Sequence, residues 1–255
     1  MRNSGKRKKK KLIKLISFDL WNTIIEDRKE LEDKRGEIRI RKIYEYLSPL
    51  NIELEDIRKA YLRMSNWLFE TQDKTKRSIG TEKQIKYILK RFGVRVNQIV
   101  FDEIKKAYES AIFFYPPPLV EGAKETLKKF YSLGIDMCII SDAGRTPGWA
   151  LRKILEKYAL NSYFKKMYFS DETGWVKPNK KVFLKALKDF KVRKEEMVHI
   201  GDKIEKDIEG AKNAGINYIY FSRDGNCEVN PCGKTLPEIY DIFLKLFPVT
   251  RSLFS

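Results

Sequence analysis

The sequence predicts a doubly wound α/β fold, in which a parallel, Rossmann-like core carries an all-helical cap inserted after its first strand. Two patterns lead to this prediction. Short apolar runs alternate with stretches of helical periodicity, as is typical of parallel strands buried between layers of helices. One long stretch then breaks the alternation with helical patterns only. The expected strands are residues 12–18, 135–140, 165–170 (the weakest pattern), 196–200 and 216–221. The expected core helices are residues 121–133, 149–160, 180–190 and 206–214.

The helical stretch contains four helical patterns, which cover residues 30–48, 53–70, 81–92 and 97–115. Three prolines at 116–118 end it, because proline cannot continue a helix and restricts the residue before it. We therefore expect a core made of residues 12–27 and 117–255, and a helical cap made of residues 28–116. Ligands of doubly wound sheets bind beyond the carboxyl ends of the strands. A cap that leaves the sheet at this edge is expected to cover the binding site.

Composition narrows the class of protein. With 255 residues, 42% of them apolar, the chain is long enough to bury a sizeable core. It has no run of about 18 uncharged apolar residues, so neither a membrane-spanning helix nor a membrane partner is expected. The first apolar run is interrupted by Lys14 and ended by Asp19, unlike the core of a signal peptide. We expect a cytoplasmic protein.

The chain is strongly basic, with a net charge of +17, and seven of its positive charges lie in residues 1–11. Terminal runs of like charge are typically disordered, so we expect a basic disordered tail that binds nucleic acid only non-specifically. The remaining positive charge suits an enzyme with an anionic substrate. Abundant Lys, Glu and Ile with few His, Met and Cys is also a composition associated with heat-adapted proteins (thermophiles).

Three cysteines and one histidine limit the available chemistry. Cys138 lies in an apolar run and is expected to be a buried free thiol. Cys227 and Cys232 flank a turn-like stretch, and the sequence leaves open whether they pair. His199 lies inside a predicted strand, where a packed role is expected rather than a chemical one. No zinc site is expected from so few soft ligands.

Polar residues follow the ends of the predicted strands, and parallel strands bring such residues to one edge of the sheet. They are Asp19, Ser141, Asp142, Lys177, Asp202 and Asp207. Carboxylates gathered in this way repel one another and need a cation to stay ionised together. Oxygen ligands that face a phosphate suit Mg²⁺. One carboxylate would then attack phosphorus and form an aspartyl-phosphate, while the lysine and the hydroxyl hold the phosphate oxygens.

Four short motifs carry a family resemblance. In chain order they are FDLWNT at 18–23, IISD at 139–142, Lys177-Pro178 followed by Phe183, and HIGDKIEKDIEGAKNAG at 199–215. They are similar to the four motifs of the haloacid dehalogenase superfamily, and the helical stretch resembles the cap that follows the first motif in that family. The resemblance covers residues 12–221, and the last motif is its most specific part.

The resemblance implies a role for each matching residue around the phosphate. Asp19 would be the nucleophile, and Lys177 would neutralise both this nucleophile and the phosphate. Ser141 would bind the transferred group. Asp142 would lie beside it, where Asn is common in the family, and we expect its carboxylate to cap the following turn. The implied function is that of a phosphatase acting on a small phosphorylated metabolite.

The resemblance also implies a magnesium site. Asp19 and Asp202 would bind Mg²⁺, and Asp207 would support the site. The family uses the backbone carbonyl two residues beyond the nucleophile as a further ligand, which is that of Trp21 here. A backbone ligand does not depend on the identity of the side chain, so the substitution at this position leaves it intact.

Trp21 is also the main departure from the family pattern. The phosphatases of the family carry a second Asp at this position as general acid and base, whereas an indole N–H is a donor only. The loss would slow hydrolysis by roughly 10²–10⁴-fold unless another residue supplies the proton. The 2-haloacid dehalogenases carry an aromatic residue here and act without a metal, but they lack the acid that Asp202 provides. A dehalogenase-like hydrolase and a weakly active binding or regulatory protein therefore stay as alternatives.

Other charged residues near the motifs are candidates for the remaining roles. Glu26 and Asp27, at the entrance to the cap, are equally plausible proton donors on sequence grounds, and Asp142 is a third candidate. The cap also carries charges that would either select the substrate or form a solvated face. They are Lys74, Lys76 and Arg77.

Overall fold

The computed structural model describes residues 12–248, so the basic tail predicted for residues 1–11 lies outside the described residues. Its centre is a sheet of six parallel strands in the order β3-β2-β1-β4-β5-β6. The strands are β1 Leu15–Phe18, β2 Asp136–Ser141, β3 Lys166–Phe169, β4 Met197–Gly201, β5 Asn217–Phe221 and β6 Cys232–Gly233. The doubly wound α/β fold predicted from the sequence is confirmed.

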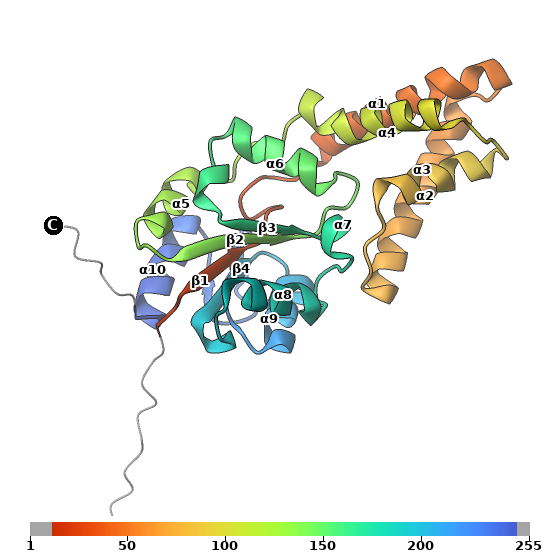
Figure 1. Ribbon diagram of the computed structural model, residues 1–255. Helices are drawn as coiled ribbons and strands as arrows, with labels where there is room; N and C mark the ends of the chain where they lie inside the picture. Colours follow the sequence, from red (N-terminus) through yellow and green to blue (C-terminus); the bar gives the residue numbers. More distant parts are fainter. Residues whose placement is uncertain (1–11, 249–255) are drawn as a thin grey trace, which may run out of the picture.

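Helices cover both faces of this sheet (Figure 1). They are α5 Ala123–Tyr131, α6 Gly148–Lys157, α8 Lys180–Phe190, α9 Glu209–Ala214 and α10 Leu236–Leu246, with the short α7 Ser170–Thr173 directly after β3. The helix predicted for residues 206–214 is in fact a π-helical turn, Ile204–Ile208, that continues into α9. The edge strand β6 and the helix α10 were not predicted. No helix in the described part of the chain is both long and apolar enough to span a membrane.

Side chains of the central strands alternate between two hydrophobic clusters, as the period of a strand requires. Ile16 and Phe18 of β1 belong to the cluster packed under α5, α6 and α10. Leu15 belongs to the second cluster, under α8 and α9. Both faces of β1 are buried, because β2 and β4 flank it and helices lie above and below. The end of β1 is therefore fixed in the middle of the molecule.

Between β1 and α5 the chain forms the helices α1 Lys29–Leu47, α2 Leu54–Thr75, α3 Thr81–Arg91 and α4 Gln98–Phe114. They pack around a hydrophobic cluster of their own, which shares no residue with the two clusters of the sheet. Figure 1 shows them grouped beside the sheet, near α7. We call this group of helices the cap.

Two joints connect the cap to the core. At the first, the chain entering the cap pairs with the chain leaving it, since Glu26 N–H donates to Pro118 O (2.8 Å) and Val120 N–H to Ile24 O (2.9 Å). At the second, the segment between α2 and α3 crosses the loop after α7, where Val176 N–H donates to Lys76 O (3.2 Å). The cap is therefore held at both ends of its contact with the core.

The cysteines are divided between the core and the loop after β5. Cys227 and Cys232 form a disulfide with a Cα–Cα distance of 5.7 Å, which decides the question that the sequence left open. The bridge closes the loop that leads into β6. Cys138 is a buried free thiol in β2, as expected.

Candidate active site

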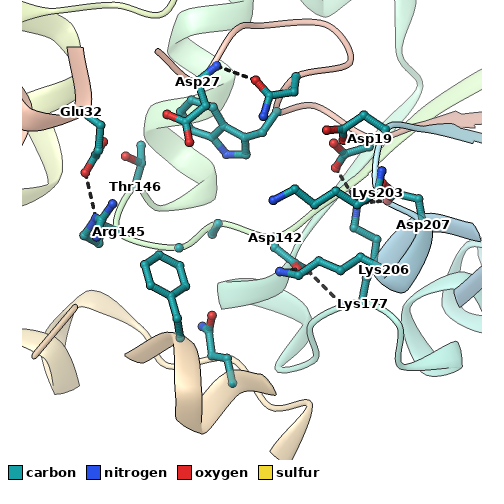
Figure 2. Close-up of a pocket in the computed structure, with 17 residues that line it drawn as sticks. Asp19, Asp27, Glu32, Asp142, Arg145, Thr146, Lys177, Lys203, Lys206 and Asp207 are labelled. Atoms are coloured by element: carbon teal, nitrogen blue, oxygen red, sulfur yellow. Dashed lines mark hydrogen bonds and ion pairs between the residues drawn. The ribbon is translucent and has the colours of Figure 1, made fainter. Parts of the chain in front are cut away.

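The end of β1 presents a carboxylate to a buried lysine. Asp19, which is 5% exposed, follows β1 directly, and its Oδ1 lies 2.5 Å from Lys177 Nζ. The same ammonium lies 2.5 Å from Asp207 Oδ1, so one lysine bridges two carboxylates (Figure 2). Lys177 comes from the loop between α7 and α8. Three loops that are distant in sequence therefore meet at the carboxyl edge of the sheet.

Asp207 is held rigidly by the turn after β4. Its Oδ2 accepts from the Lys203 N–H (2.9 Å), and its Oδ1 lies 3.2 Å from His199 Nε2. The π-helical turn brings this carboxylate back over the end of the strand, against Gly201. A Cβ at Gly201 would collide with the Asp207 side chain, so only glycine permits this approach.

His199 is packed inside the core, as expected, and also orients a site residue. It is fully buried, and its Nδ1 lies 2.8 Å from Ser17 Oγ. Burial lowers the pKa of the imidazole, although Asp207 opposes this change. His199 therefore links β1 to the Asp207 carboxylate.

The acidic cluster is electrostatically incomplete without a cation. Burial together with the Asp207 carboxylate raises the pKa of Asp19 from 3.8 to about 6 although Lys177 opposes this rise, and burial together with Asp19 and Asp207 raises that of Asp202 from 3.8 to about 8. Burial would also raise the pKa of Asp207, but the Lys177 ammonium and the bond to His199 hold it below its usual range. Carboxylates that face one another in this way ionise together only beside additional positive charge.

The geometry of the cluster suits a divalent cation. Oxygen atoms of Asp19, Asp202 and Asp207 all lie within 4.8 Å of one another. Asp202 Oδ1 is buried and has no hydrogen-bond partner among the described residues. A buried acceptor without a partner is costly in free energy, and a hard cation coordinated by oxygen would satisfy it. These residues therefore fit the predicted Mg²⁺ site.

The two residues at the end of β2 are placed differently from each other. Ser141 is buried, and its Oγ lies 3.5 Å from the Asp142 carbonyl, outside the surface that lines the cavity. Asp142 does line the cavity, but the prediction that it caps its own turn was wrong. Its Oδ1 accepts from Lys177 N–H (3.0 Å) and its Oδ2 from Lys206 Nζ (2.9 Å). The orientation of the Asp142 side chain is therefore set by residues of two other loops, which are distant from it in the sequence.

Trp21 lies in the cavity wall beside Asp19. The guanidinium carbon of Arg35 sits 5.7 Å from the centre of the indole, which anchors the ring against the cap. The side chain offers no group that both donates and accepts a proton. The position two residues beyond Asp19 is therefore an apolar wall of the site.

The cavity lies between the core and the cap and has a volume of about 130 Å³. In Figure 2 the carboxylates of Asp19 and Asp207 lie at one end and Glu32 with Arg145 at the other. Several lining residues were not predicted as site residues from the sequence. They are Asn22, Glu32, Phe69, Gln72, Ala143, Gly144, Arg145, Thr146, Lys203 and Lys206. Some of them directly follow the predicted strands and could have been predicted as site residues from that position. Glu32, Phe69 and Gln72 instead come from cap helices.

The cap charges singled out from the sequence do not line this cavity. Lys76 binds Asp73 (2.5 Å), and the guanidinium carbon of Arg77 lies 3.4 Å from the centre of the Trp175 ring. Both residues lie at the second joint between cap and core. There the Lys76 carbonyl accepts from Val176 N–H, and Arg77 contacts the Trp175 ring.

A charged network at the cap end of the cavity connects the two parts of the protein. Glu32 of α1 accepts from Arg145 Nε (2.8 Å), Arg39 Nη1 (2.9 Å) and Arg35 Nε (3.0 Å). Arg145 belongs to the loop after β2, and the side chains of Arg35 and Arg39 are fully buried. The charge-assisted hydrogen bond from Arg145 therefore joins the Glu32 carboxylate of α1 to the core, while the bonds from Arg35 and Arg39 fix this carboxylate within α1.

Comparison with known proteins identifies the family. The family of haloacid dehalogenase-like hydrolases matches residues 16–221. The glyceraldehyde 3-phosphate phosphatase of Pyrococcus furiosus is 30% identical over 214 residues, which cover 82% of this chain and 80% of that protein. The chain belongs to the haloacid dehalogenase-like hydrolases, as its four motifs predicted, and is a hydrolase.

Solved structures show the same fold. A 2-haloacid dehalogenase from Pseudomonas syringae has a TM-score of 0.69 at 19% identity, covering 92% of this chain and 99% of that chain. A phosphatase of this superfamily from Thermococcus onnurineus has a TM-score of 0.64 at 20% identity, covering 91% and 98%. At these identities the likeness concerns the arrangement of helices and strands. It does not choose between the two activities.

Proposed function

We propose that the protein is a Mg²⁺-dependent phosphatase that acts on a small phosphorylated metabolite through an aspartyl-phosphate on Asp19. The observation that carries the proposal is the acidic cluster, in which Lys177 bridges Asp19 and Asp207 beside an Asp202 oxygen without a partner. A nucleophilic carboxylate beside a cation site is the arrangement that phosphoryl transfer to aspartate requires. The relatives named as phosphatases support the same reaction.

In this mechanism the core residues position one nucleophile and neutralise charge. An Asp19 oxygen attacks phosphorus, the bond from phosphorus to the ester oxygen breaks and the alcohol leaves after protonation, and the ammonium of Lys177 screens both the carboxylate and the phosphate. Asp207 keeps Lys177 in place, since the same ammonium contacts both carboxylates. Water then attacks the aspartyl-phosphate and releases phosphate. The role of Ser141 in holding the transferred group stays a prediction, because its hydroxyl is turned toward the Asp142 carbonyl.

Asp19, Asp202 and the Trp21 carbonyl would hold Mg²⁺, with Asp207 supporting the site through Lys177 and the turn after β4. The bound ion would offset the negative charge of the phosphate and of the two carboxylates. The raised pKa values of Asp19 and Asp202 support this assignment, since both side chains are poorly stabilised as anions by the residues around them.

The proton for the leaving group would come from Asp27, because Trp21 cannot supply it. Asp27 lines the cavity, and its N–H is held by Asn22 Oδ1 (2.9 Å). Partial burial and the nearby Glu32 carboxylate raise the pKa of Asp27, which favours a group able to carry a proton. The sequence left Glu26 equally plausible. Its carboxylate is instead bound by Arg28 and Arg223, and although burial opposes them, these arginines lower its pKa.

The substrate would be a short phosphorylated sugar or aldehyde. Sites for drug-sized ligands span roughly 300–1,000 Å³, whereas this cavity measures about 130 Å³. The relatives named as glyceraldehyde 3-phosphate phosphatases point to the same size class.

Hydrolysis of p-nitrophenyl phosphate and of a panel of three-carbon phosphates, measured with Mg²⁺ and with EDTA, tests the proposal. We expect turnover that depends on Mg²⁺ and disappears on chelation. Activity that survives full chelation would contradict the metal-dependent mechanism and favour the dehalogenase-like alternative. Complete lack of turnover by folded protein would favour the binding or regulatory alternative.

A further inference from the structure

The cap places one buried polar group in the cavity without a partner. Gln72 of α2 is 5% exposed and lines the cavity together with Phe69, one turn earlier on the same helix. Its side-chain nitrogen Nε2 is buried and has no hydrogen-bond partner among residues 12–248. Burying an amide without a partner costs free energy, and such groups in native proteins call for an explanation. A ligand oxygen in the cavity would supply the missing acceptor.

The charged groups around Gln72 do not need a ligand. Glu32 accepts from Arg145, Arg39 and Arg35, and Arg145 also donates to Ser65 Oγ. The guanidinium carbon of Arg145 lies 5.1 Å from the centre of the Phe69 ring. Glu32 and Arg145 therefore have hydrogen-bond partners within the protein, and the amide nitrogen of Gln72 is left without one.

One cation of the cavity has no hydrogen-bond partner of its own. The ammonium of Lys203 forms no hydrogen bond or ion pair with the described residues, and its side chain reaches into the cavity (Figure 2). Lys203 lines the cavity together with six carboxylates, whereas the lining contains four basic side chains in all. The lining therefore offers no excess of positive charge for a second anionic group.

We infer that Gln72 is a specificity-determining residue whose amide donates a hydrogen bond to an uncharged oxygen of the leaving group. The site accordingly selects phosphate monoesters with hydroxyl or carbonyl groups and without a second anionic group. Phe69 forms the apolar wall beside this oxygen. The inference rests on the proposed phosphatase function and names its substrate class, because a neutral donor in a cavity without an excess of positive charge favours a neutral acceptor.

Three substrates of equal carbon length test the inference on the full-length protein with Mg²⁺. They are glycerol 3-phosphate, with two hydroxyls; n-propyl phosphate, with none; and 3-phosphoglycerate, with a carboxylate. We expect kcat/KM for glycerol 3-phosphate to exceed that for each of the other two by about tenfold or more, as expected when a site hydrogen-bonds a substrate hydroxyl.

Substitution of Gln72 separates recognition from structure. In Gln72→Met, which keeps the length of the side chain, kcat/KM for glycerol 3-phosphate should fall by about tenfold while that for n-propyl phosphate stays within about threefold. Gln72→Glu, which removes the donor and adds a charge, should lose the same preference. The melting temperature of Gln72→Met should not fall, since no internal hydrogen bond is lost. Glu70→Gln, an exposed change on the same helix, is the control and should leave all three substrates unchanged.

The outcomes are distinguishable. Equal loss for all three substrates in Gln72→Met, together with a lower melting temperature, would mean that Gln72 is structural and would overturn the inference. A wild-type preference for 3-phosphoglycerate would overturn it as well. If the wild-type protein hydrolyses no phosphate monoester at all, including p-nitrophenyl phosphate, the proposed function itself fails.

Discussion

The two walls of the cavity are built on different physical principles. The core wall gathers like charges at the ends of buried strands, so that Asp19 and Asp202 have raised pKa values and one Asp202 oxygen lacks a partner. On the cap wall Glu32 and the arginines around it have hydrogen-bond partners within the protein, and the neutral amide nitrogen of Gln72 is left without one. Unsatisfied charge suits chemistry, whereas an unsatisfied neutral group suits recognition.

The walls also differ in what holds them in place. Asp207 is held by the turn after β4, and Gly201 leaves room for its side chain because it has no Cβ. These contacts lie within one short segment of the chain. The cap wall depends on contacts between elements that are distant in sequence, such as Arg39 Nη2 with Thr146 Oγ1 at 3.2 Å. Changes in the cap would therefore alter the shape of the cavity more than they alter the positions of the catalytic groups.

The largest effect is expected at the core wall, from Asp19→Asn. The change removes the nucleophile but keeps the size of the side chain, so kcat should fall by about 10⁴-fold or more, as for nucleophiles of other enzymes. Steady-state kinetics with the fold checked by circular dichroism measures this. Retention of a tenth of the wild-type rate would show that another group attacks phosphorus.

At the cap wall, Glu32→Gln should mainly reduce stability. The substitution leaves the buried guanidinium groups of Arg35 and Arg39 without their shared anion, and breaking a buried ion pair costs about 3–5 kcal/mol. Urea denaturation measures the loss. Glu45→Gln is the control, because the exposed pair Lys42–Glu45 is expected to contribute about 0–1 kcal/mol. Equal losses in both variants would remove the distinction between the network and an ordinary surface pair.

Mg²⁺ should stabilise the protein more at pH 8 than at pH 5. Without metal, the raised pKa values of Asp19 (about 6) and Asp202 (about 8) mean that the folded state binds protons more tightly than the unfolded state. These two groups therefore destabilise the metal-free protein progressively as the pH rises from about 4 to about 8. Mg²⁺ competes with those protons, and at 100 times its Kd it should add about 2.7 kcal/mol.

Melting curves with and without Mg²⁺ at the two pH values measure this effect. Asp202→Asn should abolish the shift caused by Mg²⁺. A shift of unchanged size in that variant would rule out Asp202 as a ligand and would locate the metal elsewhere.

The smallest effect is expected for Asp27→Asn and depends on the leaving group. Loss of the proton donor should reduce kcat/KM for glycerol 3-phosphate by about tenfold or more and barely affect p-nitrophenyl phosphate, whose leaving group needs little protonation. Glu26→Gln is the matched control and should change neither rate appreciably, since its carboxylate is bound to Arg28 and Arg223. An equal loss on both substrates would mean that Asp27 acts through cap placement.

Much of the core wall could be predicted because local sequence carries it. Apolar runs locate the strands, parallel strands bring their carboxyl ends together, and Asp19, Lys177, Asp202 and Asp207 follow those ends at short distances. The structure brings these four residues together. Their roles, the Mg²⁺ requirement, the cytoplasmic location, the domain limits and the adaptation to heat stay predictions.

Some details of the carboxyl edge of the sheet could not be predicted from the local sequence. Asp142 binds Lys177 N–H and Lys206 instead of its own turn, because partners from two other loops arrive within hydrogen-bonding distance. Glu26 binds Arg223, a residue almost 200 positions away in the chain, and does not line the cavity, whereas Asp27 does. The pairing of Cys227 with Cys232 likewise required the geometry of the loop after β5.

By itself the sequence determined the alternation of strands and helices, the inserted helical segment and the acidic edge of the sheet, since each follows from a period or a motif within a few residues. Only the tertiary structure decided which polar residues of the cap face the cavity. Gln72 and Glu32 lie on helices whose polar positions have the same spacing whether water or a binding site covers them. What distinguishes such residues is the surface packed against them, and that surface comes from the core.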